Sequence, residues 1–384
     1  MSMGGQLSSS VVVACSALAA ASASAAEWRI TPSSSVAADY SDNPRLLTSG
    51  GEAANGVRSE LSTQLLMRTE RVALSMIPRI VSSHYSNDAT LSSTDEFIDF
   101  AGQWQSERTT WATTANFTRD TTLTSEIGFT GLIQSNRRHE GITLGGGPTV
   151  QVTERLSLGG QLYEMRNHYV DARYTGLVDY DYSLAGLNAG WVVSERTTLT
   201  VDASAGELRA PDAGMKTRNE SLKLGMNYTV SELWMAKLSA GPAWVQADAG
   251  EDTGWVLSSE FHRHTERNDW SVTLARELTP AGQGLLTRRD SLSIGFIHQI
   301  TEHTAAEVYV HAINNQTLSP GLAVNYDTVH YQQVETRFRW MLSPSWSLVA
   351  SASAQRQSFS TYPDAAAGSR ALLNIVWNGQ PKLL

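Results

Sequence analysis

The feature that most constrains this chain is a short turn motif that recurs about every 40 residues. Apolar and polar residues alternate on both sides of each copy, as in Leu199, Val201 and Ala203 against their polar neighbours. A period of two indicates β-strands with one apolar and one polar face. The copies are Thr69-Glu70-Arg71, Ser106-Glu107-Arg108, Thr153-Glu154-Arg155, Ser194-Glu195-Arg196, Ser231-Glu232, Thr265-Glu266-Arg267, Thr301-Glu302 and, as a variant, Ser343-Pro344-Ser345.

Longer links rich in Gly, Asn and Asp lie between the short turns. They are expected at residues 41–56, 87–95, 121–139, 171–179, 210–217, 249–253, 279–286, 316–328 and 361–368. These turns and links join eighteen strands, each of about ten residues, with short turns at one end and longer loops at the other. The chain is therefore predicted to be all-β: a single antiparallel transmembrane β-barrel of about 18 strands, with 16–18 as the range, short periplasmic turns and longer extracellular loops.

The tryptophans support this interpretation. Many of the 11 Trp residues lie near a short turn, where they would form an aromatic ring at a membrane interface. A β-propeller has a similar period, but its blades hold four short strands, whereas each segment here holds two long ones. No apolar run after the N-terminus is long enough for a helical span. The Trp residues concerned are Trp104, Trp111, Trp191, Trp234, Trp270, Trp340 and Trp346.

Residues 1–26 have the pattern of a signal peptide. Val11 to Ala20 form an apolar core, and a run of small residues follows, with cleavage expected after Ala25 or Ala26. Residues 27–384 would then form the barrel in the bacterial outer membrane. The only cysteine, Cys15, lies in the segment to be removed; the alternative is a lipidated N-terminus at Cys15, because the preceding residues resemble a lipobox.

Strand alternation predicts a polar inner face and an outer face with almost no charge, since Arg or Lys facing lipid near the midplane costs about 2–4 kcal/mol. The arginines and lysines of the inner face either belong to a solvated wall with cross-strand ion pairs or line a path for an anionic solute. The candidate lumen-lining residues are Lys223, Lys237, Glu260, His262, Glu307, Tyr309, His311, Glu335, Arg337 and Arg339.

A barrel of this width leaves an aqueous channel, which an inward-folded loop usually narrows. The link at 121–139 is the longest and, unlike the others, carries apolar residues. Phe129, Arg137 and Arg138 are therefore candidates for a constriction. The alternative is that this loop packs over the rim or extends the strands.

No enzyme motif is found: G-x-S-x-G, G-x-x-x-x-G-K-[ST] and H-E-x-x-H are all absent. His262 and His264 share a strand but have no third histidine or cysteine nearby, so no metal site, cofactor or catalytic residue is expected. The net charge of -9 argues against a nucleic-acid partner. Outer-membrane lipid is the expected partner, and the oligomeric state stays open.

The segment Tyr40-Ser41-Asp42-Asn43-Pro44-Arg45-Leu46 resembles a family of outer-membrane β-barrel porins, which carry a similar Y-x-D-N element after the first strand. Several members occur with exopolysaccharide or surface-polysaccharide systems. The resemblance implies an outer-membrane barrel, with polysaccharide or polysaccharide-export proteins as further partners. The sequence thus predicts a pore for passive passage of small polar solutes or of a surface polysaccharide; a non-conducting scaffold or adhesin barrel is the alternative.

Overall fold

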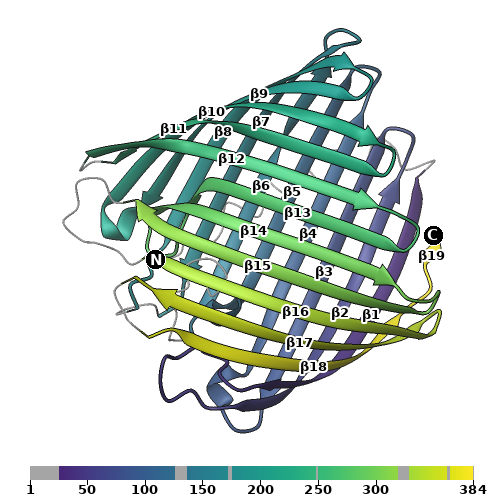
Figure 1. Ribbon diagram of the computed structural model, residues 1–384, viewed down its shortest axis with the longest axis vertical. Helices are drawn as coiled ribbons and strands as arrows, with labels where there is room; N and C mark the ends of the chain where they lie inside the picture. Colours follow the sequence, from purple (N-terminus) through teal and green to yellow (C-terminus); the bar gives the residue numbers. More distant parts are fainter. Residues whose placement is uncertain are drawn as a thin grey trace.

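The computed structural model describes residues 26–125, 136–171, 175–247, 250–318, 328–360 and 364–383. Eighteen long strands form one antiparallel sheet, and β1 pairs with both β2 and β18, which closes the sheet into a barrel (Figure 1). A short strand, β19, pairs with the start of β1. The predicted all-β barrel and the count of eighteen strands are confirmed.

The strands follow the chain order around the barrel, with η1 (Ala89–Leu91), α2 (Thr122–Ser125) and η2 (Pro211–Ala213) in the loops. Their bounds are β1 Glu27–Ser41, β2 Ala54–Arg68, β3 Val72–Tyr85, β4 Ser93–Gln105, β5 Thr109–Thr121, β6 Arg138–Gln151, β7 Leu156–Tyr169, β8 Tyr180–Ser194, β9 Thr197–Ala210, β10 Met215–Ser231, β11 Trp234–Ala247, β12 Gly250–His264, β13 Asn268–Pro280, β14 Leu286–Gln299, β15 Thr304–Leu318, β16 Val329–Ser343, β17 Trp346–Phe359, β18 Ala366–Asn378 and β19 Lys382–Leu383. No helix in the described part of the chain has the length and apolar character of a membrane span.

Each short turn motif connects two consecutive strands, as the sequence predicts. At the first copy the Thr69 backbone N–H donates to Val72 O at 2.8 Å, and the Val72 N–H donates to the Thr69 hydroxyl oxygen at 2.9 Å. Thr265 and Asn268 are joined in the same way. A Ser or Thr at this position therefore supplies a side-chain acceptor for the first backbone N–H of the next strand, which explains its recurrence.

The strands are longer than the ten residues expected, and this is a correction. They run from 13 to 17 residues, so several predicted loops contribute to strands instead. β11 ends at Ala247 and β12 begins at Gly250, although residues 249–253 were expected to form a loop. About ten tilted residues are enough to cross the hydrocarbon layer, so the strands project beyond it at the long-loop end.

The ladder register separates an inner from an outer face. Tyr85 on β3 donates to Asp39 on β1 at 2.7 Å, across β2, and Tyr182 on β8 donates to Asn219 on β10 at 3.3 Å. Side chains that reach past an intervening strand converge on the concave side of the sheet. The opposite face carries exposed leucines such as Leu187, which is 71% exposed, and this is the face that suits lipid.

The expectation of an almost uncharged outer face is wrong at the long-loop end. Arg119 on β5 forms ion pairs with Glu96 and Glu140 on the two adjacent strands, at 3.7 and 3.1 Å. Glu207 on β9 similarly pairs with Arg218 at 2.9 Å. These residues lie where the strands extend past the apolar zone, so water rather than hydrocarbon solvates them.

The tryptophans near the short turns lie on the outer face. Trp104 stands opposite Trp111, and Trp346 opposite Trp377. Trp270 packs against Phe296, with ring centroids 4.1 Å apart. An aromatic band of this kind marks a membrane interface, which gives the barrel a defined depth in the bilayer.

Candidate pore-lining site

Five of the residues selected from the sequence meet on the inner face of β15 and β16. Arg339 binds Glu307 at 2.9 Å, and Arg337 binds Glu335 at 2.6 Å. The Tyr309 hydroxyl donates to Glu307 at 3.0 Å, and the Arg337 guanidinium lies over the Tyr309 ring, 5.0 Å from its centroid. Glu307 is only 3% exposed. The cluster therefore holds two fixed carboxylates beneath two accessible guanidinium groups.

The other selected residues lie in separate places. Lys237 and Glu260 form an ion pair of 2.9 Å between β11 and β12. His311 bonds to Ser293 at 2.8 Å. Lys223 on β10 stands opposite Asp202 on β9, and no ion pair within 4.0 Å joins Lys223 to a described carboxylate. Only the β15–β16 group is thus a single connected network.

His262 and His264 both bond to Asp269, each at 3.0 Å. This carboxylate on β13 holds the two imidazole rings beside the short turn at residues 265–267. Within the described residues, no group of three or more His, Cys, Asp or Glu side chains is arranged to hold a metal ion. The two histidines therefore fasten the β12–β13 turn.

A further cluster on the inner face was missed at the sequence level. Arg370 on β18 makes two bonds to Asp39 on β1, at 2.8 and 2.5 Å, and Tyr85 on β3 donates to the same carboxylate. Asp39 is 4% exposed. The signal was present, because Ala37, Asp39 and Ser41 alternate with Val36, Ala38 and Tyr40. The loop motif that begins at Tyr40 conceals this continuation of the strand pattern.

The segment that carries the family resemblance covers the end of β1 and the start of the β1–β2 loop. The Asn43 amide donates to Leu47 O at 2.8 Å and to Ala367 O at 3.0 Å. Leu46 adopts a left-handed φ of 49° and packs against Ile313 and Tyr331. This loop therefore bends over the barrel mouth toward β15 and β16.

Two loop carboxylates fix this segment. Hydrogen bonds from Ser369 hold the pKa of Asp42 below its ordinary value, and both Ser369 atoms donate at 2.6 Å. The Thr90 hydroxyl lowers the pKa of Asp88 in the same way, with Arg45 adding an ion pair of 2.7 Å. Both groups are thus held in their ionised form at neutral pH.

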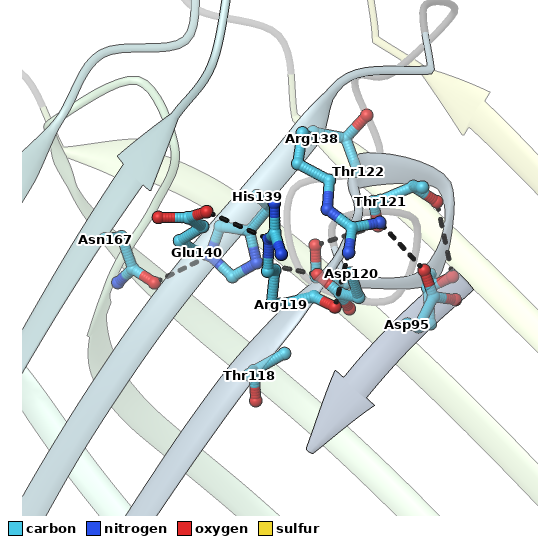
Figure 2. Close-up of polar contacts among 12 residues, drawn as sticks. Asp95, Thr118, Arg119, Asp120, Thr121, Thr122, Arg138, His139, Glu140 and Asn167 are labelled. Atoms are coloured by element: carbon cyan, nitrogen blue, oxygen red, sulfur yellow. Dashed lines mark hydrogen bonds and ion pairs between the residues drawn. The ribbon is translucent and has the colours of Figure 1, made fainter. Parts of the chain in front are cut away.

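A buried polar network surrounds the base of the β5–β6 loop (Figure 2). His139 lies between Asp120 and Asn167, with each ring nitrogen 2.8 Å from one of these partners. Arg138 points to Asp95, at 3.4 Å, and donates to Thr94 O at 2.7 Å. Asp120 is 2% exposed and His139 6%. The network ties β4, β5, β6 and β7 together at their long-loop ends.

The predicted constriction at 121–139 stays untested. Phe129 lies outside the described residues. Arg138 is the first residue of β6 and is held by the Figure 2 network. Arg137 lies beside that network, and its backbone N–H donates to the Thr122 hydroxyl at 3.0 Å. The two arginines also line a pocket of about 470 Å³ with Arg119 and Glu96.

The described residues show a different narrowing, made by the β7–β8 loop and the β13–β14 turn. The Val178 N–H donates to Gly282 O at 2.8 Å, which links the two segments. An apolar cluster lies around this contact and includes Leu177, Leu208, Val245 and the fully buried Leu286. Members from β9, β11 and β14 can meet only inside the barrel, so these segments reduce the lumen at the long-loop end.

No protein-family model and no curated protein matches the chain. Solved structures of outer-membrane porins do match. OccK2 of Pseudomonas aeruginosa, in complex with glucuronate, aligns with a TM-score of 0.50 and 10% identity over 92% of this chain and 98% of OccK2. OccK9 of the same organism aligns with a TM-score of 0.50 and 12% identity over 91% and 98% of the two chains. The chain therefore has the fold of the Occ porins.

Proposed function

We propose that this chain is a porin-like channel of the bacterial outer membrane that lets small polar solutes pass passively. The observation that carries the proposal is the two-faced wall: exposed leucines outside, and fixed charges of both signs inside a closed barrel of eighteen strands. A barrel of this size encloses more space than its own side chains fill. Water and polar solutes would use that space.

The inner charges suggest a preference for anionic solutes. Arg337 and Arg339 keep 41% and 55% of their side chains exposed, whereas their partners Glu335 and Glu307 keep 18% and 3%. A solute therefore meets the guanidinium groups before the carboxylates. Guanidinium groups bind carboxylates through paired hydrogen bonds, and the sugar acid glucuronate bound by OccK2 is an example of such a solute.

A planar-bilayer recording tests this function. The refolded protein should give steady conductance steps, and a salt gradient should show a bias toward anions. The double variant Arg337→Gln/Lys223→Gln should shift the reversal potential toward cation preference. Arg166→Gln removes a charge on the outer face and should leave it unchanged. Unaltered selectivity in the double variant would refute the role of the inner cations.

A non-conducting scaffold is the second candidate, and one observation favours it. The apolar cluster at Leu286 and the Val178–Gly282 contact fill part of the lumen with protein. If they close it, the folded and heat-modifiable protein would stay silent in the bilayer. That result would reject the open channel and leave the scaffold.

The polysaccharide route implied by the family resemblance is a more specific form of the channel hypothesis. Sugar rings stack on aromatic side chains, so a continuous row of tyrosines would favour it. Tyr163 packs edge-on against Tyr182 on β7 and β8, whereas Tyr309 and Tyr331 lie on β15 and β16. Because the tyrosines form two separate groups, the passage of small solutes is the version we prefer.

A further inference from the structure

The wall of the barrel is interrupted between β12 and β13. The ladder joins these strands from His264 opposite Asp269 to Leu257 opposite Arg276, and stops there. β11 continues to pair with β12 as far as Gly250, and β14 with β13 as far as Pro280. Figure 1 shows β13 diverging from β12 toward the long-loop end. We call this interruption the fork.

Above the fork, the β13–β14 hairpin lies inside the barrel. Leu278 and Leu286 continue the lipid-side row of Leu274 in the ladder register. They pack, however, in a cluster with Leu208 and Val245, which belong to the inner face of β9 and β11. The outer surface of the hairpin thus covers the inner surface of the neighbouring wall.

Two glycines show how closely the hairpin approaches that wall. A Cβ on Gly284, in the hairpin turn, would lie 2.6 Å from the Cβ of Ala210 on β9. A Cβ on Gly254, on the inner face of β12, would lie 3.7 Å from Nη1 of Arg288 on β14. Arg288 therefore reaches the inner face of β12 past β13, at the lumenal side of the fork.

Arginine and tryptophan side chains line the mouth of the fork. Arg276 on β13 binds Asp290 through two bonds, at 2.5 and 2.7 Å, and lies 4.0 Å from the ring centroid of Trp255 on β12. Trp255 is 51% exposed on the outer face. Arg288 adds a second arginine to the single carboxylate of Asp290 on this face of the hairpin. Of the acids in the fork segments, Glu277 lies on the opposite face of β13, and Glu251 on β12 bonds to Gln246 on β11.

We propose that the fork is a lateral portal that admits a single-chain amphiphile with an anionic head group, such as a long-chain carboxylate, from the outer leaflet. An exposed Trp marks the level of the membrane interface, where such a head group resides. The head would bind Arg276 and Arg288, and the chain would slide along Leu278 between the hairpin and β12. No backbone ladder has to be broken, because none joins the strands there.

The test uses the full-length protein in lipid nanodiscs with a hexadecanoate that carries a diazirine on its tail. Photolabelling followed by mass spectrometry should concentrate on residues 250–257 and 276–280. Arg276→Gln or Arg288→Gln should lower this labelling about tenfold, as expected for the loss of a charge-assisted hydrogen bond. Arg119→Gln, on the outer face of β5, is the matched control. A hexadecylamine with the same diazirine should label the segment weakly.

A disulfide across the fork provides a second test of the portal. Continuing the register by one step would place Val256 opposite Glu277, so Val256→Cys/Glu277→Cys should close the fork when oxidised. Cys15 is the only native cysteine and is replaced by Ser. Labelling should fall when the disulfide forms and return on reduction. The pair Ser258→Cys/Ala275→Cys, inside the existing ladder, should have no effect.

Two results would overturn the portal. The first is labelling that is spread evenly around the lipid face. The second is labelling that is equal for the carboxylate and the amine and is unaffected by the disulfide. The portal does not depend on whether the barrel conducts. A silent barrel that is labelled at the fork would refute the channel alone, and a conducting barrel without such labelling would refute the portal alone.

Discussion

The β5–β6 seam and the β12–β13 seam join neighbouring strands of one barrel, yet only the first is paired along its whole length. β5 pairs with β6 from Thr109 to Thr121, the last residue of the strand. β13 leaves β12 after Arg276. The two seams differ in the residues that follow the apolar zone on the outer face.

Around β5, those residues are charged. Arg119 forms ion pairs with Glu96 and Glu140 in water, so these strands can continue beyond the membrane without bending inward. On β13 and β14 the same face also carries Arg276, Arg288 and Asp290, but the last residues of β13 to β15 include Leu278, Leu286 and Leu318, which join the inner apolar cluster. Exposing leucines to the water beyond the membrane is unfavourable. Folding inward therefore lowers the free energy of these strand ends. The wall thus bends inward where the strands end in leucines that pack in the inner cluster.

The largest loss of stability is expected at the β5–β6 seam, which is paired along its whole length. Asp120→Ala leaves His139 without its buried carboxylate partner and should cost about 3 kcal/mol of unfolding free energy. Urea unfolding in detergent micelles measures this loss. Asp99→Ala is the control, because Asp99 lies on the same inner face but is exposed, with Asn116 as its partner. Equal losses for the two variants would show that the buried network does not hold the seam.

A smaller loss of stability, together with a change in conductance, is expected at the β12–β13 seam, where the β13–β14 hairpin bends inward. Leu286→Ala removes a fully buried side chain and should cost about 2 kcal/mol or more, as in other core truncations. Because the hairpin loses its anchor, single-channel conductance should rise. Leu274→Ala, which faces lipid on the same hairpin, should leave conductance unchanged. A lower conductance in Leu286→Ala would contradict the inward anchoring.

The smallest effect concerns pH and the β1–β2 loop. The pKa values of Asp42 and Asp88 are lowered in the folded protein by bonds from Ser369 and Thr90. A lowered carboxyl pKa stabilises the loop above the ordinary pKa of about 3.9, and this contribution is lost as pH falls through the folded value. Hydrogen exchange of residues 42–53, corrected for intrinsic rates, should be constant from pH 5 to 8 and faster near pH 2.5. Protection that also declines between pH 7 and 5 would point to other groups.

The sequence predicted the barrel well because its signals are local. The turn motif supplies its own acceptor, as Thr69 does for Val72, and alternation assigns each strand residue to a face without knowledge of distant contacts. These two signals were sufficient for the strand count and for grouping Glu307, Tyr309 and Arg337 on one face.

The inward bend of the β13–β14 hairpin, the strand lengths and the Asp39–Arg370 pair could not be predicted from these local signals. Leu278 and Leu286 have the same alternation as lipid-facing leucines, and only their partners on β9 and β11 show that they lie inside. The strand lengths were underestimated because charged residues such as Arg119 and Glu207 resemble loop residues in sequence, although they sit in paired strands. Asp39 was missed because its partner, Arg370, lies at the other end of the chain.

The pairing of β1 with β18 also has a consequence for how the barrel assembles. Apart from the short pairing of β1 with β19, every other ladder joins consecutive strands and needs only a short loop closure, whereas Asp39 and Arg370 are 331 positions apart. Closing so long a loop is entropically costly and slow. This junction is therefore expected to form last, and until it does both end strands expose free backbone edges of the kind on which aggregation starts. The Asp39–Arg370 pair thus stabilises the junction that leaves the sheet without a free edge.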